Sequence, residues 1–129
     1  LAPRRSLAPA PLAAPVSTPN EQAGQLLAQI AQQANAGQHQ QARAACEQYL
    51  QRFEPAAPVY YWLGLLSDTA GDSSQALMHY RKALYLDPQH AEALLHLAML
   101  LAAQGDEAGA RRLQERAARA GRSEREPER

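Results

Sequence analysis

Three glycines at a constant spacing place the strongest constraint on how this chain can fold. They are Gly37, Gly71 and Gly105, each 34 residues from the next. Three alanines repeat the same spacing: Ala42, Ala76 and Ala110. Glycine commonly ends a helix, and Asp72 and Asp106, which follow two of the glycines, can cap the next helix. Gln38 occupies the equivalent place after the first glycine. Each interval therefore predicts two helices joined by a tight turn.

Apolar residues between these glycines recur with the period of a helix and do not alternate as in a strand. One such face is formed by Leu94, Leu97, Ala98 and Leu101. We place three contiguous repeats at 23–56, 57–90 and 91–124. Gly64 and Ala98 are small enough to let the two helices of a hairpin approach closely. Because a single hairpin cannot bury its apolar face alone, the repeats are expected to stack into an all-α solenoid.

A period of 34 residues with two helices per unit resembles the tetratricopeptide (TPR) repeat. The middle repeat matches it best, through Tyr60-x-x-Leu63-Gly64, Ala76, Tyr80, Ala83 and Pro88. The first repeat departs from the pattern, with Gln29 and Ile30 where the other two have Leu-Gly and Leu-Ala. The resemblance implies an α-solenoid of three tandem TPR helical hairpins.

The two ends of the chain differ in composition from the repeats. Residues 1–19 hold five of the nine prolines, interleaved with alanine, and predict a disordered linker, not an export signal. The run Thr18-Pro19-Asn20-Glu21 predicts a helix start with a capping box and a proline in the first turn. We therefore expect the TPR domain over 20–121. The charged residues 122–129 have no apolar face and predict a frayed tail.

Composition excludes several classes of function. The formal net charge is zero, so attraction to nucleic acid is not expected. No apolar run approaches the roughly 20 residues that membrane insertion requires. Cys46 is the single cysteine, which favours a cytoplasmic protein without an intrachain disulfide. Because phosphate-binding loops, paired carboxylates and metal-ligand spacings are absent from the sequence, we expect no catalytic residue, no metal site and no cofactor here.

The aromatic run Tyr60-Tyr61-Trp62 cannot be all core, because three consecutive helical residues span roughly 200° of arc. The repeat register points Tyr60 between the helices, Tyr61 to the concave side and Trp62 to its border. Two interpretations stay open: a locally bulky core with one exposed ring, or an aromatic anchor for a bound peptide. The predicted peptide groove comprises Leu27, Ala31, Tyr61, Trp62, Leu65, Asp68, Leu95, His96 and Met99. It lacks the basic residues of a carboxylate clamp.

A second candidate surface is basic. Residues 111–129 carry seven Arg against four Glu. On the last predicted helix, Ala110, Leu113 and Ala117 face inward, so its polar outer side would serve as the cap of the array. The secondary basic surface comprises Arg111, Arg112, Arg116 and Arg119. The alternative is an ordinary solvated helix face.

The resemblance goes beyond a generic repeat at residues 81–98. Their sequence is Arg-Lys-Ala-Leu-Tyr-Leu-Asp-Pro-Gln-His-Ala-Glu-Ala-Leu-Leu-His-Leu-Ala. Together with Tyr60-Tyr61-Trp62-Leu63-Gly64-Leu65-Leu66, they resemble the C-terminal TPR region of CheR-type chemoreceptor glutamate methyltransferases, in particular the Wsp-type enzymes of biofilm signalling. The resemblance implies that a parent protein uses S-adenosylmethionine, with its catalytic residues outside this chain.

Two classes of function follow. The first is a docking or regulatory module that binds a protein or peptide, such as a chemoreceptor or another signalling protein. The second is a self-association or structural module, in which a second copy of the chain covers the same apolar residues to form a homo-oligomer. Exposed groove residues in the single chain favour the first class.

Overall fold

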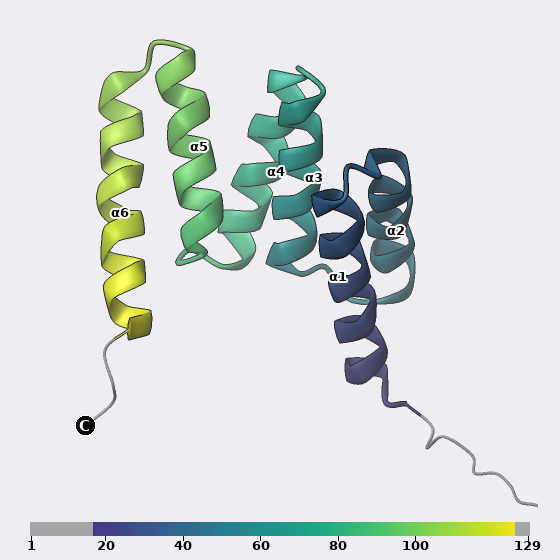
Figure 1. The fold of residues 1–129 in the computed structure, drawn as a ribbon. Helices are drawn as coiled ribbons and strands as arrows, with labels where there is room; N and C mark the ends of the chain where they lie inside the picture. The colour runs from purple at the N-terminus through teal and green to yellow at the C-terminus, as the bar shows by residue number, and fades with distance from the viewer. Residues whose placement is uncertain (1–16, 126–129) are drawn as a thin grey trace, which may run out of the picture.

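The structure is a computed structural model that describes residues 17–125. In this range the chain is all-α, and its helices are α1 (Pro19–Asn35), α2 (His39–Arg52), α3 (Ala57–Thr69), α4 (Ser73–Leu86), α5 (Ala91–Ala103) and α6 (Glu107–Arg125). They form three antiparallel hairpins placed side by side in chain order (Figure 1). Residues 1–16 of the predicted linker 1–19, and residues 126–129 of the predicted tail, lie outside the described residues.

The turns inside the hairpins confirm the role of the repeating glycines. Gly37, Gly71 and Gly105 have φ angles of 80°, 84° and 94°. This left-handed conformation is open to glycine and strained for residues with a β-carbon. The carboxylate of Asp72 accepts a hydrogen bond from the Gln75 amide at 3.2 Å, and Asp106 caps α6 in the same way. Gln38 makes no such side-chain bond.

The first helix starts where its sequence signal predicts. Thr18 Oγ1 accepts a hydrogen bond from the Glu21 amide at 3.1 Å, and Glu21 Oε1 accepts one from the Thr18 amide at 2.9 Å. The last helix, α6, continues past Gly121 to Arg125, so it includes the first four residues of the segment 122–129 that the sequence predicts as a frayed tail. Arginine and glutamate have high helix propensity, and one glycine costs only about 1 kcal/mol in a helix.

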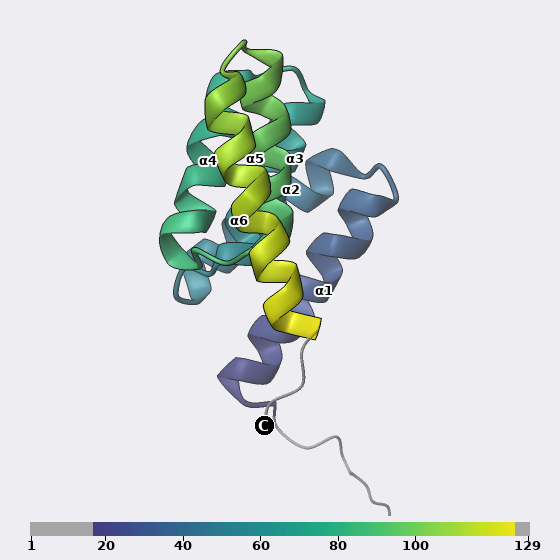
Figure 2. The ribbon, with the colours of Figure 1, turned by 90° about the vertical axis from the view of Figure 1, so that its left-hand side faces the viewer.

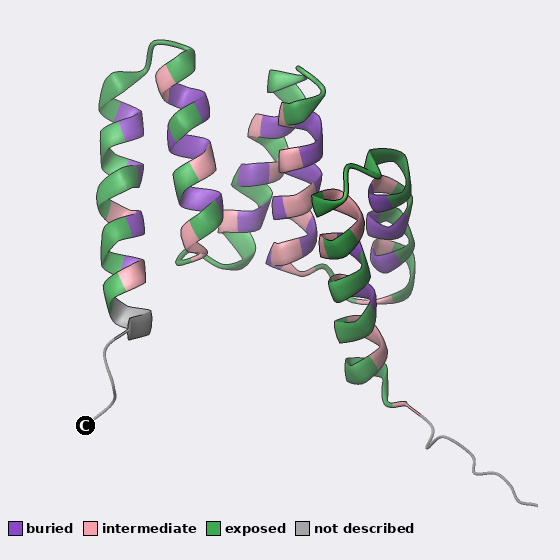
Figure 3. Ribbon diagram, in the orientation of Figure 1, coloured by how far each residue is buried: buried purple, intermediate pink, exposed green. Residues whose placement is uncertain are grey.

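Buried side chains form two clusters that meet in the middle hairpin. Figure 3 marks the positions of the buried residues along the ribbon in purple. The smaller cluster joins α1 and α2 to one side of α3 and includes Ile30, Cys46 and Val59. The larger cluster runs from α3 to α6 and includes Tyr80, Leu94 and Leu113. Tyr60 and Trp62 pack against both clusters. The run of aromatic residues on α3 therefore connects the two parts of the core.

The last hairpin closes the array without an additional helix in the described range. Ala110, Leu113 and Ala117 are buried, as predicted for the inward side of α6. Figure 2, in which α6 faces the viewer, shows this helix at the outer end of the array. No helix among residues 17–125 is both long and apolar enough to cross a bilayer.

Candidate functional site

The first helices of the three hairpins, α1, α3 and α5, carry the aliphatic residues of the predicted groove. We call Leu27, Ala31, Leu65, Leu95 and Met99 the first-helix face. Leu95 and Met99 lie one turn apart on α5 and are 46 % and 62 % exposed. The other three are half-buried. Because α3 contacts both α1 and α5, the helices that carry this face are neighbours in space. Its role as a binding groove stays a prediction.

Tyr61 differs from its expected place. The residue is only 5 % exposed, so the interpretation of Tyr61 as an exposed anchor is wrong. Its ring centroid lies 5.1 Å from that of Trp62, 5.3 Å from His90 and 5.6 Å from His96. Burial, followed by the nearby carboxylate of Glu92, raises the pKa of the Tyr61 hydroxyl. Tyr61 is therefore a core residue between α3 and α5, and Tyr60 and Trp62 beside it are half-buried.

The predicted acid of the groove, Asp68, has a partner inside the protein. The Tyr80 hydroxyl donates a hydrogen bond to Asp68 Oδ2 at 3.3 Å. Tyr80 is fully buried, and burial, with the adjacent Asp68 carboxylate, raises its pKa well above the ordinary value. The His96 ring lies 6.1 Å from the Tyr80 ring. Asp68 thus lies beside the Tyr80 ring, and His96 lies beside the rings of both Tyr61 and Tyr80.

Sequence reasoning missed His90. Its Nδ1 accepts a hydrogen bond from the Ala93 amide at 3.1 Å and so caps the start of α5. The ring also lies against Tyr61. Helix caps are usually Ser, Thr, Asp or Asn, so a histidine at this position gives little signal in the sequence. His90 thereby orients α5, which carries Leu95 and Met99.

The predicted basic surface divides into residues that line clefts and one that does not. A cleft of about 470 Å³ lies between α4 and α6, and its lining includes Arg112 and Arg116. Arg116 and Arg119 line an adjoining cleft of about 350 Å³, together with Pro88 and Ala120. Arg111 lines neither cleft. Sequence reasoning treated the four arginines as one surface because their side chains all lie on a single helix.

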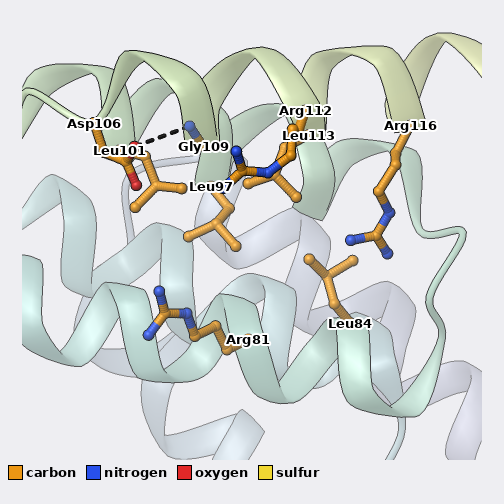
Figure 4. Close-up of a pocket in the computed structure, with 9 residues that line it drawn as sticks. All are labelled: Arg81, Leu84, Leu97, Leu101, Asp106, Gly109, Arg112, Leu113 and Arg116. Atoms are coloured by element: carbon orange, nitrogen blue, oxygen red, sulfur yellow. Dashed lines mark hydrogen bonds between the residues drawn. The ribbon is translucent and has the colours of Figure 1, made fainter.

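The first cleft also contains residues that sequence reasoning did not assign to it. Arg81 and Leu84 of α4 form one wall, facing Arg112 and Arg116 of α6 across the cleft (Figure 4). Leucines at positions 97, 101 and 113 complete an apolar floor. Arg116 Nη2 donates a hydrogen bond to the Pro88 carbonyl oxygen at 3.0 Å, which holds this side chain at one end. Arg81 lies about 30 residues from the others, so only the stacking of hairpins brings them together.

Two further features bear on chemistry. Cys46 is fully buried, and burial raises the pKa of its thiol to about 12. A thiol of this kind stays protonated and unreactive at neutral pH. Among residues 17–122, whose side chains the structure describes, no three His, Cys, Asp or Glu residues are grouped so that they could hold a metal ion.

Comparison with known sequences agrees with the repeat analysis. The family model described as tetratricopeptide repeat matches residues 69–126. The chain is 72 % identical over 103 residues to the probable biofilm formation methyltransferase WspC of Pseudomonas putida, covering 80 % of this chain. It is 62 % identical over 109 residues to the Pseudomonas aeruginosa protein of the same name, covering 84 % of this chain. In each case it spans only 24 % of the relative's length.

Solved structures share the same architecture. The Yersinia enterocolitica type III secretion translocator chaperone SycD aligns with a TM-score of 0.68 at 18 % identity, over 78 % of this chain and 75 % of that one. PcrH, solved in complex with the chaperone binding region of PopB, aligns with a TM-score of 0.62 at 25 % identity, over 78 % and 92 %. This chain therefore has the fold of a tetratricopeptide-repeat solenoid, and its sequence is similar to that of the probable biofilm formation methyltransferases WspC of Pseudomonas.

Proposed function

We propose that this chain is a docking module that binds a segment of a partner protein on the first-helix face. The observation that carries the proposal is the exposure of Leu95 and Met99, one turn apart on α5. Burying large apolar side chains against a partner stabilises a complex by roughly 25 cal/mol per Å² of apolar area. Methionine adapts its shape to different partners, and it is common at surfaces that bind peptides.

The packing beneath these residues supports such a role. The rings of Tyr61, Tyr80 and His96 lie within 6.4 Å of one another, centroid to centroid, at the junction of α3, α4 and α5. A buried ring cluster holds the backbone of α5 in place. Little backbone entropy would then be lost in presenting Leu95 and Met99 to a ligand. In this proposal Tyr61 supports the face from below and does not contact the partner.

The comparisons support binding of a peptide in general terms. PcrH has the same fold and was solved with a region of PopB bound to it. By analogy, a segment of another protein is the expected ligand here. An apolar or amphipathic segment fits the first-helix face better than an acidic tail, because the face is built from Leu, Ala and Met side chains.

The similarity to the WspC proteins supports a more specific proposal about the kind of protein to which the module belongs. We propose that it is the repeat region of a cytoplasmic chemoreceptor methyltransferase. In that parent the module would dock the enzyme to a receptor or another signalling protein. The methyl transfer, with its S-adenosylmethionine, would take place outside this chain.

A capture experiment with a matched pair of variants tests the proposal. The 129-residue chain is immobilised as wild type, Met99→Gln and Met78→Gln, and is exposed to extract of cells that contain the parent protein. Met78 on α4 is 53 % exposed and serves as the control, because it is outside the first-helix face. We expect a receptor or signalling protein to be retained by wild type and Met78→Gln and to be lost from Met99→Gln.

The alternative is self-association through the same face. It predicts a concentration-dependent dimer in analytical ultracentrifugation that Met99→Gln abolishes. A wild type that dimerises in this way, or a bound protein that Met99→Gln retains as well as wild type, would refute docking on the first-helix face.

A further inference from the structure

The clefts along α6 offer a second surface of different chemistry from the first-helix face. Three guanidinium groups, from Arg81, Arg112 and Arg116, surround a floor of leucine side chains (Figure 4). Arg81 and Arg112 are exposed, whereas Arg116 is half-buried and fixed by its hydrogen bond to the Pro88 carbonyl oxygen. Among the described residues that line the cleft, Asp106 contributes the one carboxylate, and it accepts a hydrogen bond from the Gly109 amide at the start of α6.

The length of this surface is well defined. The first cleft begins near Gly109, and the adjoining cleft, which shares Arg116 with it, extends to Ala120. At a rise of 1.5 Å per residue, this part of α6 is about 16 Å long. A ligand of about 11 residues in a helix, or about five in an extended segment, would cover it.

From these features we propose that the clefts bind an acidic amphipathic segment of a partner protein. Carboxylates on the segment would pair with Arg81, Arg112 and Arg116, because guanidinium forks match carboxylates in geometry and charge. Apolar side chains of the segment would lie on Leu84, Leu97 and the neighbouring leucines. Charge complementarity therefore specifies the occupant, and it differs from the apolar ligand proposed for the first-helix face.

A nucleic acid fits these residues less well. The lining of the two clefts contains no aromatic side chain on which a base could stack. Its floor is aliphatic, and the net charge of the chain is zero. A ligand bound through its phosphates alone would favour a longer row of basic side chains than the arginines that line these clefts.

Adjacent arginines on α6 provide a sharp test. Arg111 and Arg112 are both exposed, but only Arg112 lines the cleft. Random peptides of about 12 residues, displayed on phage, are selected on the 129-residue chain, and each selected peptide is then titrated by fluorescence anisotropy. The proteins compared are wild type, Arg112→Glu, Arg81→Glu on the opposite wall, and Arg111→Glu. Circular dichroism verifies that each variant keeps its helical content.

We expect one group of selected peptides to combine Asp or Glu with Leu, Ile or Phe. Their dissociation constants should rise about tenfold or more in Arg112→Glu and Arg81→Glu, and less than about twofold in Arg111→Glu. Their affinity should fall as salt is raised and should be unchanged in Met99→Gln, which separates this surface from the first-helix face.

Three results would overturn the proposal. The first is a selection that yields no peptides that depend on Arg112. The second is an Arg111→Glu variant that weakens the acidic peptides as much as Arg112→Glu does, which would indicate diffuse attraction to the whole helix. The third is Arg112-dependent binding of a single-stranded oligonucleotide or a phosphatidylserine vesicle that is tighter than the binding of any selected peptide, which would assign the cleft to a different class of ligand.

Discussion

The ring of Tyr80 on α4 packs directly on the backbone of Gly64 on α3. A β-carbon built at Gly64 would lie 2.5 Å from Cδ1 and 2.6 Å from Cε1 of that ring. A residue with a β-carbon at position 64 would therefore fit into the middle hairpin only if the Tyr80 ring moved. The same Tyr80 holds Asp68 through its hydroxyl group and lies beside the Tyr61 ring, so this contact sets the geometry beneath the first-helix face.

Replacing Gly64 by alanine should destabilise the protein. The added methyl group must displace a fully buried ring, and such overpacking costs about 1–3 kcal/mol in the free energy of unfolding. Gly24 is the matched control, because it lies in α1 and a β-carbon there would meet no atom within 4 Å. Gly24→Ala should stabilise by up to about 1 kcal/mol through better helix propensity. Urea unfolding of both variants measures the difference, and equal effects would contradict this packing.

The spacing of glycines predicts most of the fold because the turn geometry depends on local sequence. Each of the three glycines has a left-handed backbone conformation that other residues adopt only with strain. The positions of these glycines in the sequence therefore predict the positions of the turns. The capping box at Thr18 is equally local. The end of α6 was harder to predict, because arginine and glutamate continue a helix past Gly121 without any apolar pattern.

The site was only partly predictable because burial depends on contacts between hairpins. Repeat register placed Leu95 and Met99 correctly on the exposed side of α5. The same register failed for Tyr61, since it takes no account of His90 and His96, which α5 and its preceding loop place against the ring. The cleft beside α6 was missed for the same reason, as Arg81 comes from another repeat.

Alkaline pH should weaken the fold through Tyr80. Burial and Asp68 raise the pKa of Tyr80 in the folded state above the ordinary value of 10.0. The stability that this pKa difference gives to the folded state is fully present below pH 10. It is lost as the pH rises further, because the Tyr80 hydroxyl loses its proton at a lower pH in the unfolded chain than in the folded one. Tyr80→Phe should be less stable at neutral pH by about 0.5–1.5 kcal/mol, owing to the lost hydrogen bond, and should lose less stability above pH 10. Thermal melts across this pH range measure both effects. A variant as alkali-sensitive as wild type would show that another group is responsible.

Cys46 should resist modification as long as the protein is folded. Its side chain is fully buried, and its thiol has a pKa of about 12. Because the thiolate is the reactive form, Ellman's reagent should react with Cys46 slowly in buffer and rapidly in denaturant. Since Cys46 is the single cysteine, the absorbance change reports this site alone. Rapid reaction in buffer would mean that the α1–α2 hairpin opens readily.

Docking on the first-helix face is tested most directly by the affinity of the captured partner, measured by calorimetry at low and high salt. Wild type, Met99→Ala and the control Met78→Ala are compared. Because apolar burial drives the proposed contact, the dissociation constant should change little with salt. It should rise about tenfold or more in Met99→Ala and less than about twofold in Met78→Ala. A steep dependence on salt, or equal affinity in the two variants, would contradict docking on this face.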